Sequence, residues 1–206
     1  SRGLGDVYKR QALTVLDGLM RGETVNFDGE FYQINGLEGS PRPRQGPRPP
    51  IAVGGGGPKM LALAAKHADI ISVAPGTTTD GKMKLSDMTI EKTAERVDRI
   101  RQVAGDRFDE LELNWAIAVI VITDDRVATA EMALKAFEQG YPPNIAHDTE
   151  FTVDDVLTSP YIAIGSFDEI ADQIREVRRR TTMSYVGVFP TQMDAFAPVL
   201  AQLKGE

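Results

Sequence analysis

Four consecutive glycines, Gly54 to Gly57, are the residues of this sequence best placed to bind an anionic ligand. Glycine has no Cβ, so the backbone amides of such a run can approach an anion closely. Pro58 and Lys59 follow, and proline is favoured at the first position of a helix, where free amides and the helix dipole attract phosphate. A tight structural turn needs only one glycine, so we favour a phosphate-binding turn over a purely structural one.

A second loop, residues 74–79 (APGTTT), offers amide and hydroxyl donors to the same ligand, although an ordinary surface loop explains it equally well. Neither loop matches a known nucleotide-binding motif. The glycine run does not end in the Gly-Lys-Ser/Thr of a P-loop, and no acidic residue follows the next strand at the spacing of the dinucleotide-binding fingerprint. The two loops therefore predict an anion site without specifying its ligand.

Other residue types exclude several kinds of chemistry. The sequence has no cysteine, which rules out disulfides, thiolate metal sites and cysteine nucleophiles. Its two histidines are too few for a histidine-rich metal site, so we predict no metal. We expect His67 to cap or pack a helix, and His147 to lie in an exposed loop or line a substrate lid. Asp154 and Asp155 are adjacent and cannot face one site as an acid–base pair, so no catalytic residue is assigned.

Length and charge limit the class of protein. The chain has 206 residues, of which 42% are hydrophobic, which is enough to bury one core. Its net charge of −7 argues against nucleic acid or an anionic membrane surface as the main partner. No apolar run approaches the roughly 20 residues that span a bilayer, and the N-terminus lacks the apolar segment of a signal peptide. We therefore expect a cytoplasmic globular protein that acts on a small molecule.

The first eleven residues (SRGLGDVYKRQ) share no pattern with the remainder of the sequence. They resemble the adaptor-derived leader found on open reading frames from shotgun assemblies. We interpret residues 1–11 as a non-native leader and residues 12–206 as one partial domain; a native flexible terminus is the alternative.

The rest of the chain alternates between strand and helix patterns. Strands are predicted at residues 51–53, 70–73, 111–122 and 185–189. Helices are predicted at residues 12–21, 58–67, 89–104, 127–137 and 167–179, and a last one is predicted with Asp194 as its cap. Such alternation implies parallel β/α units, either in a doubly wound sheet or in part of a (β/α)8 barrel. In both architectures ligands bind at the carboxyl ends of the strands, where the glycine run lies.

Three segments interrupt this alternation. A hairpin is predicted around Asp28-Gly29, and residues 140–160 form an insertion. Residues 40–50 are proline-rich, and we favour an extended surface connection over a proline-rich recognition motif or a basic patch, because a strand follows at once.

Several segments carry a resemblance to one family. They are residues 48–61 (RPPIAVGGGGPKML), 65–71 (AKHADII), 159–160 (SP), 164–170 (IGSFDEI) and 184–186 (SYV). Together they resemble the luciferase-like monooxygenase superfamily, in particular its deazaflavin (coenzyme F420)-dependent oxidoreductases. The resemblance runs in order from Ala12 to Leu203.

This resemblance implies an α/β fold in which the predicted strands are strands 5–8 of a (β/α)8 TIM barrel, so that the chain is an N-terminally truncated half. It also implies that the glycine turn and the next loop bind the phosphate-bearing side chain of the cofactor. The cofactor-binding residues implied in this way are Val53, Gly54, Gly55, Gly56, Gly57, Ala74, Thr77 and Thr78. Relatives place ring-binding and proton-transfer residues after the first four strands, which this sequence lacks, so the catalytic residues stay unknown.

The implied activity is hydride transfer between coenzyme F420 and a small organic substrate. An FMN-dependent luciferase-like monooxygenase is the alternative within the superfamily, because both cofactors have a ring, a ribityl chain and a phosphate. A non-catalytic or inactive fragment that binds a phosphorylated ligand is the alternative of a different class. We expect a homodimer for the full-length protein, and no nucleic-acid or membrane partner.

Overall fold

The computed structural model describes residues 2–205, and the side chains of residues 7–205. Its helices are α1 (Arg2–Met20), α2 (Pro58–His67), α3 (Ile90–Ala104), α4 (Arg126–Glu138), α5 (Val153–Thr158), α6 (Phe167–Thr181) and α7 (Met193–Leu203). Its strands are β1 (Thr24–Asp28), β2 (Gln33–Glu38), β3 (Ala52–Gly55), β4 (Ile70–Val73), β5 (Met83–Lys84), β6 (Glu112–Ala116), β7 (Val119–Ile122), β8 (Ile145–Ala146), β9 (Ile162–Gly165) and β10 (Tyr185–Gly187). Three short 3-10 helices are η1 (Leu85–Asp87), η2 (Gly105–Glu110) and η3 (Pro190–Gln192).

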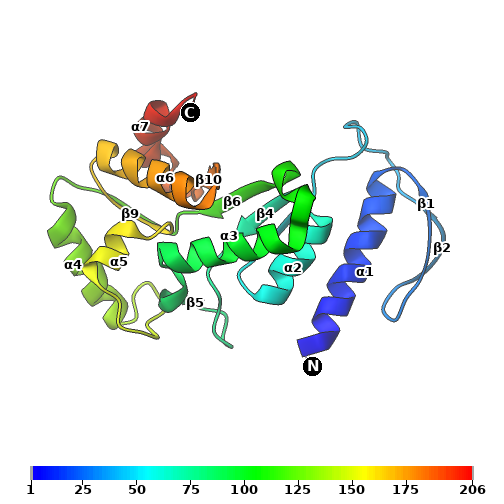
Figure 1. Ribbon diagram of the computed structural model, residues 1–206, viewed down its shortest axis with the longest axis horizontal. Helices are drawn as coiled ribbons and strands as arrows, with labels where there is room; N and C mark the ends of the chain where they lie inside the picture. Colours follow the sequence, from blue (N-terminus) through cyan, green and yellow to red (C-terminus); the bar gives the residue numbers. More distant parts are fainter. Residues whose placement is uncertain (1, 206) are drawn as a thin grey trace.

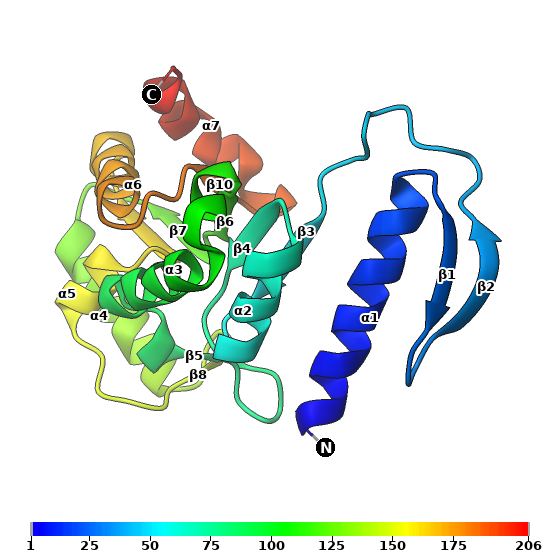
Figure 2. The same cartoon turned by 45° about the vertical axis from the view of Figure 1, so that its right-hand side comes forward.

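The centre of the fold is a four-stranded sheet in the order β10-β6-β4-β3, in which all neighbours run parallel. α2 and α3 pack against each other and cover this sheet (Figures 1 and 2). Two further parallel pairs, β7-β9 and β5-β8, lie outside it, and β1-β2 is an antiparallel hairpin. Parallel strands joined by helices confirm the predicted α/β class. The strands that the structure describes form no closed barrel, so the half-barrel remains a proposal.

Local signals predict several helix ends correctly. α2 spans the predicted residues 58–67. α3 begins after Thr89, whose hydroxyl accepts a hydrogen bond from the Lys92 amide at 3.2 Å. α6 begins with the capping box formed by Ser166 and Glu169. The predicted cap at Asp194 is wrong, because α7 begins one residue earlier and its N-terminus has no side-chain cap.

The predicted strand 111–122 is wrong, because this apolar run forms two strands with different partners. β6 pairs with β4 and β10, whereas β7 pairs with β9. The change occurs at Ile117, whose amide still donates to Gly187, while the next amide, of Ala118, donates to Tyr161 at 2.8 Å. β9 was not predicted as a strand, although its four residues are all buried.

The proline-rich segment is the predicted extended connection, and one of its residues anchors it. The side chain of Arg48 is only 8% exposed and forms ion pairs with Asp17 of α1 and with Asp69, the latter at 2.5 Å. Asp69 also accepts the Ile51 amide at 2.7 Å, immediately before β3. Burial acts to raise the pKa of Asp69, but these hydrogen bonds outweigh it and hold the pKa below its usual value. The start of β3 is therefore tied to both α1 and β4.

α1 lies between α2 and the hairpin β1-β2, and it includes most of the segment interpreted as a leader (Figure 2). Gln11 is buried and accepts the Phe31 amide at 2.9 Å, while the ring of Tyr8 stacks on that of Tyr32. Ser1 lies outside the described residues. A non-native origin for residues 1–11 remains a prediction.

The hydrophobic core lies between the sheet and its helices, and Trp115, Tyr161 and Phe196 are its largest fully buried side chains. Within the described residues, no helix has both the length and the apolar composition needed to cross a membrane.

Candidate functional site

The glycine turn joins the carboxyl end of β3 to the N-terminus of α2, as predicted. Gly57 is the N-cap, with φ −81° and ψ 147°, and Pro58 occupies the first turn of the helix. No side chain caps this end. Amides in the first turn of a helix have no intrahelical acceptor, so this terminus is suited to an anion.

The loop after β4 lies against this turn. Gly55 and Val73 are in register, and the Ala74 amide donates to the Gly55 carbonyl at 3.2 Å. A Cβ on Gly56 would lie 2.6 Å from the Pro75 carbonyl and closer still to that of Ala74. The two loops therefore meet backbone to backbone, and only glycine fits at Gly56.

This contact corrects the argument that one glycine would satisfy a structural turn. Gly56 is required by the neighbouring loop, and a Cβ on Gly55 would overlap the Met60 side chain. Gly54 makes only ordinary contact with Ser72, and nothing lies within 4 Å of a Cβ placed on Gly57. Packing thus explains two of the four glycines, and the open space lies at the helix N-terminus.

Thr77 and Thr78 lie further along the second loop than the residues that touch the glycine turn. Thr77 forms a β-bridge with Met83. The hydroxyl of Thr78 donates to Asp80 at 2.5 Å, and its amide donates to the Lys82 carbonyl at 2.8 Å. The structure therefore brings Ala74 next to the predicted glycine turn. Thr78 instead forms its hydrogen bonds within its own loop, to Asp80 and Lys82.

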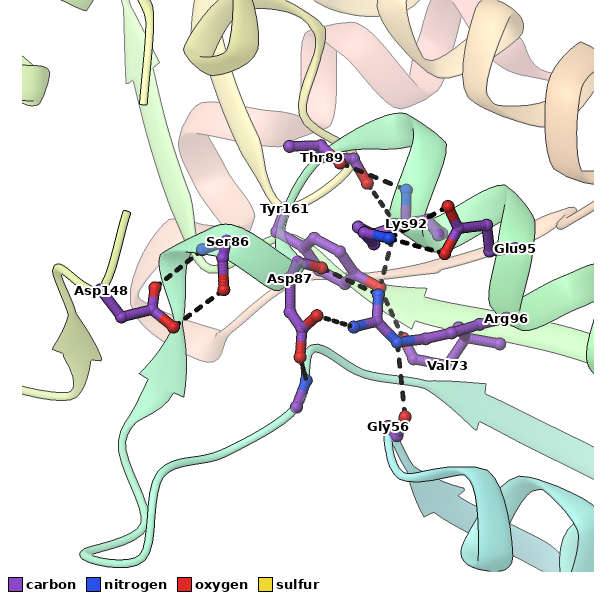
Figure 3. Close-up of polar contacts among 12 residues, drawn as sticks. Gly56, Val73, Ser86, Asp87, Thr89, Lys92, Glu95, Arg96, Asp148 and Tyr161 are labelled. Atoms are coloured by element: carbon purple, nitrogen blue, oxygen red, sulfur yellow. Dashed lines mark hydrogen bonds and ion pairs between the residues drawn. The ribbon is translucent and has the colours of Figure 1, made fainter. Parts of the chain in front are cut away.

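Arg96 of α3 joins the two loops and was missed by the sequence analysis. Its side chain is 9% exposed, and it pairs with the Asp87 carboxylate at 2.8 Å (Figure 3). It also donates to the Asp87 carbonyl at 2.8 Å and to the Gly56 carbonyl at 3.4 Å. Asp87 in turn accepts the Gly76 amide at 3.1 Å. The available signal was an arginine on the apolar stripe of the helix, beside Val97 and Ile100.

A pocket of about 320 Å³ opens between the glycine turn and α3. Its lining residues are Gly56, Gly57, Pro58, Leu61, Gly76, Asp87, Lys92, Glu95, Arg96 and Arg99. Three of them are cations and two are acids, so the lining is net positive in a chain of net charge −7. Glu95 pairs with Lys92 at 2.8 Å. This local charge favours an anion despite the overall field.

A buried tyrosine forms a hydrogen bond to the start of the second loop. The Tyr161 hydroxyl donates to the Val73 carbonyl, at the end of β4, at 3.3 Å (Figure 3). Burial raises the pKa of this hydroxyl, which keeps it protonated as a donor. The loop is thus anchored where it leaves the sheet.

The remaining residues considered in the sequence lie elsewhere. His67 ends α2 as expected, and burial, with Arg107 and Lys66 nearby, lowers its pKa. His147 is exposed in the loop after β8. Asp155 accepts the Thr152 amide in the capping box of α5. Among the side chains of residues 7–205, no three of the metal-binding types come together.

A larger pocket of about 480 Å³ lies between α6, α7 and β10. Its lining is mostly apolar, with Trp115, Val186 and Leu200 among its residues. It contains none of the predicted cofactor-binding residues, so we place the candidate site at the glycine turn.

Known proteins share both the sequence pattern and the fold. The luciferase-like monooxygenase family model matches residues 9–184, and the chain belongs to this family. Among curated proteins, it is 28% identical over 138 residues to the 5,10-methylenetetrahydromethanopterin reductase of Archaeoglobus fulgidus. It is 24% identical over 170 residues to the F420-dependent glucose-6-phosphate dehydrogenase of Gordonia bronchialis.

A solved structure shows the same fold at low identity. The coenzyme F420-dependent tetrahydromethanopterin reductase of Methanopyrus kandleri matches 94% of this chain with a TM-score of 0.66 at 15% identity. The chain covers 61% of that protein, and its alignments with the two curated relatives cover 66% and 81% of this chain but only 38% and 49% of theirs.

Proposed function

We propose that this chain forms the phosphate-binding part of the cofactor site of an F420-dependent oxidoreductase, which transfers hydride between the cofactor and a small organic substrate. One observation carries the proposal. The glycine turn opens onto an uncapped helix N-terminus, inside a net-positive pocket at the carboxyl ends of parallel strands. Both curated relatives described above are reductases or dehydrogenases, and the name of one states its dependence on F420.

The residues present fit a phosphate group. Apart from its two chain neighbours, nothing lies within 4 Å of a Cβ placed on Gly57, and a turn of glycines leaves no side chains to shield its backbone from an anion. Of the residues that the resemblance implies, Gly56 and Gly57 line the pocket, and Ala74 contacts the same turn through its bond to Gly55. Val53, Gly54, Thr77 and Thr78 do not line it. A deazaflavin bound there would supply a ring that accepts or donates hydride. The chain's own part is to hold the phosphate and so orient the ring.

The half-barrel belongs to the same proposal. The order β10-β6-β4-β3 is the order expected for strands 8-7-6-5 of a barrel. One face of this sheet carries half-exposed polar residues, since Ser72 donates to Asn114 at 2.8 Å and Asn114 donates to the Tyr185 carbonyl at 2.9 Å. This face would line the barrel interior in a full-length enzyme, for which a homodimer is also proposed.

FMN is the second candidate cofactor, as the resemblance to luciferase-like monooxygenases implies. It also carries a phosphate on its ribityl chain, so the glycine turn suits both cofactors. A non-catalytic module for phosphorylated ligands remains the third candidate.

Fluorescence titration of the chain with F420, FMN and riboflavin tests the proposal. We expect F420 and FMN to bind at least about tenfold more tightly than riboflavin, because only they carry a phosphate for the turn. Tight binding of FMN without F420 would favour the monooxygenase. Equal affinity for FMN and riboflavin would overturn the phosphate site, and binding of inorganic phosphate without either ring cofactor would favour the non-catalytic module.

A further inference from the structure

We propose that Arg96 and Asp87 form a positioning pair that sets the spacing between the glycine turn and the loop after β4. The affinity of the site for the cofactor's phosphate, rather than for its ring, then depends on this pair. The second statement rests on the proposed function, whereas the first concerns only the two loops.

The pair connects the loops through a continuous chain of contacts (Figure 3). On one side Arg96 donates to the Gly56 carbonyl at 3.4 Å, and on the other Asp87 accepts the Gly76 amide at 3.1 Å. The ion pair between them measures 2.8 Å. The carbonyl of Asp87 accepts a further bond from Arg96, which holds the 3-10 helix η1 against α3.

Each loop has a glycine, Gly56 or Gly76, at the point where it contacts this pair. A Cβ on Gly56 would collide with the backbone at Ala74 and Pro75, and a Cβ on Gly76 would overlap the Asp87 carboxylate. No side chain can therefore act as a spacer at either point. The position of one loop relative to the other is set by the pair and by direct backbone contact.

The charge of Arg96 is already balanced by Asp87, so its role differs from that of a free phosphate-binding cation. Each of its three nitrogens has a different acceptor: the Asp87 carboxylate, the Asp87 carbonyl and the Gly56 carbonyl. Only the planar fork of arginine can serve three acceptors in this arrangement, and a lysine would keep the charge but lose the geometry. With 9% exposure, the group also has little water to replace a lost partner.

Hydrogen exchange without any ligand tests the spacing role. Arg96→Lys should raise amide exchange in residues 54–57 and in residues 74–78 by about tenfold, because both loops lose their common anchor. The matched control is Arg126→Lys, since Arg126 also binds two carbonyls, those of Leu157 and Ile164, but outside this site. Unchanged exchange in either loop of Arg96→Lys, or an equal rise in the control, would overturn the positioning role.

Cofactor titration tests the consequence for the phosphate. Arg96→Lys and Asp87→Asn should each weaken FMN binding by roughly tenfold while riboflavin binding stays unchanged, and the double variant should lose little more. Full retention of FMN affinity in Arg96→Lys, or an equal loss for FMN and riboflavin, would contradict the inference. If the wild-type chain itself failed to distinguish FMN from riboflavin, the proposed function would fail, while the exchange experiment would still decide the spacing role.

Discussion

Gly56 and Gly57 are neighbours in the turn but have opposite surroundings. A Cβ on Gly56 would strike the backbone of the next loop, whereas a Cβ on Gly57 would meet nothing within 4 Å. Gly57 also has φ −81°, which any residue can adopt. Substitutions at Gly56 therefore test the packing of the turn against the next loop, whereas substitutions at Gly57 test the helix N-terminus.

Gly56→Ala should destabilise the chain by about 1–3 kcal/mol, because the added methyl group forces the two loops apart. Urea unfolding followed by circular dichroism measures this change. Gly57→Ser is the control, and its stability should equal or slightly exceed that of the wild type, since serine is a good N-cap. A stability of Gly56→Ala equal to that of the wild type would show that the loops do not meet as described.

The glycine turn was predictable from the sequence because its signals are local: a glycine run, then proline, then an apolar helix pattern. Arg96 was not, because its acceptor Gly56 lies 40 residues away in the chain. Nothing in the spacing of Asp87 and Arg96 indicates that both belong to the same loop junction. The partners of a buried charge are set by tertiary packing.

At the scale of elements, the same division between local and distant signals holds. α2, α3 and α6 were predictable from apolar periodicity and capping residues. The break between β6 and β7 was not, because residues 115–122 are apolar throughout and the chain changes partners only through contacts with β10 and β9. β9 was not predictable, because a strand of only four residues next to an insertion is too short to show a period.

The proline-rich connection depends on one buried arginine, and this gives a prediction for pH. Arg48→Gln should lower the free energy of unfolding by about 1–3 kcal/mol at neutral pH, since two carboxylates lose a charged partner. Urea unfolding measures this cost. Arg21→Gln is the control, because Arg21 pairs with the same Asp17 but is 38% exposed, and its loss should destabilise the chain much less than the loss of Arg48.

The direction in which pH changes the stabilisation by Arg48 follows from the pKa values of its two carboxyl partners. For Asp17 and Asp69, burial acts to raise the pKa, but the arginine hydrogen bonds outweigh it, and both values lie below the usual 3.8. Their contribution to stability is therefore complete above that value and is lost as the pH falls below it. The difference between wild type and Arg48→Gln should shrink as the pH falls from about 4 towards about 2. A constant difference over this range would contradict the ion-pair account.

At the scale of the whole molecule, the site lies where one edge of the parallel sheet meets its covering helices. β3 is the edge strand of the four-stranded sheet, next to β4 (Figure 2). The turn that follows it lines the pocket beside α3. The sheet order and the family membership agree with a luciferase-like fold. The central claim is that the phosphate of the cofactor binds at this edge.

Amide chemical shifts of the ¹⁵N-labelled chain test that claim most directly. On addition of F420 or FMN, the largest shifts should fall on residues 54–57 and on Ala74, and riboflavin should leave these signals in place because it lacks the phosphate. The opposite result would be shifts concentrated at Trp115, Val186 and Leu200, in the pocket between α6 and α7, with the glycine amides unmoved. That outcome would place the ligand elsewhere and contradict the account.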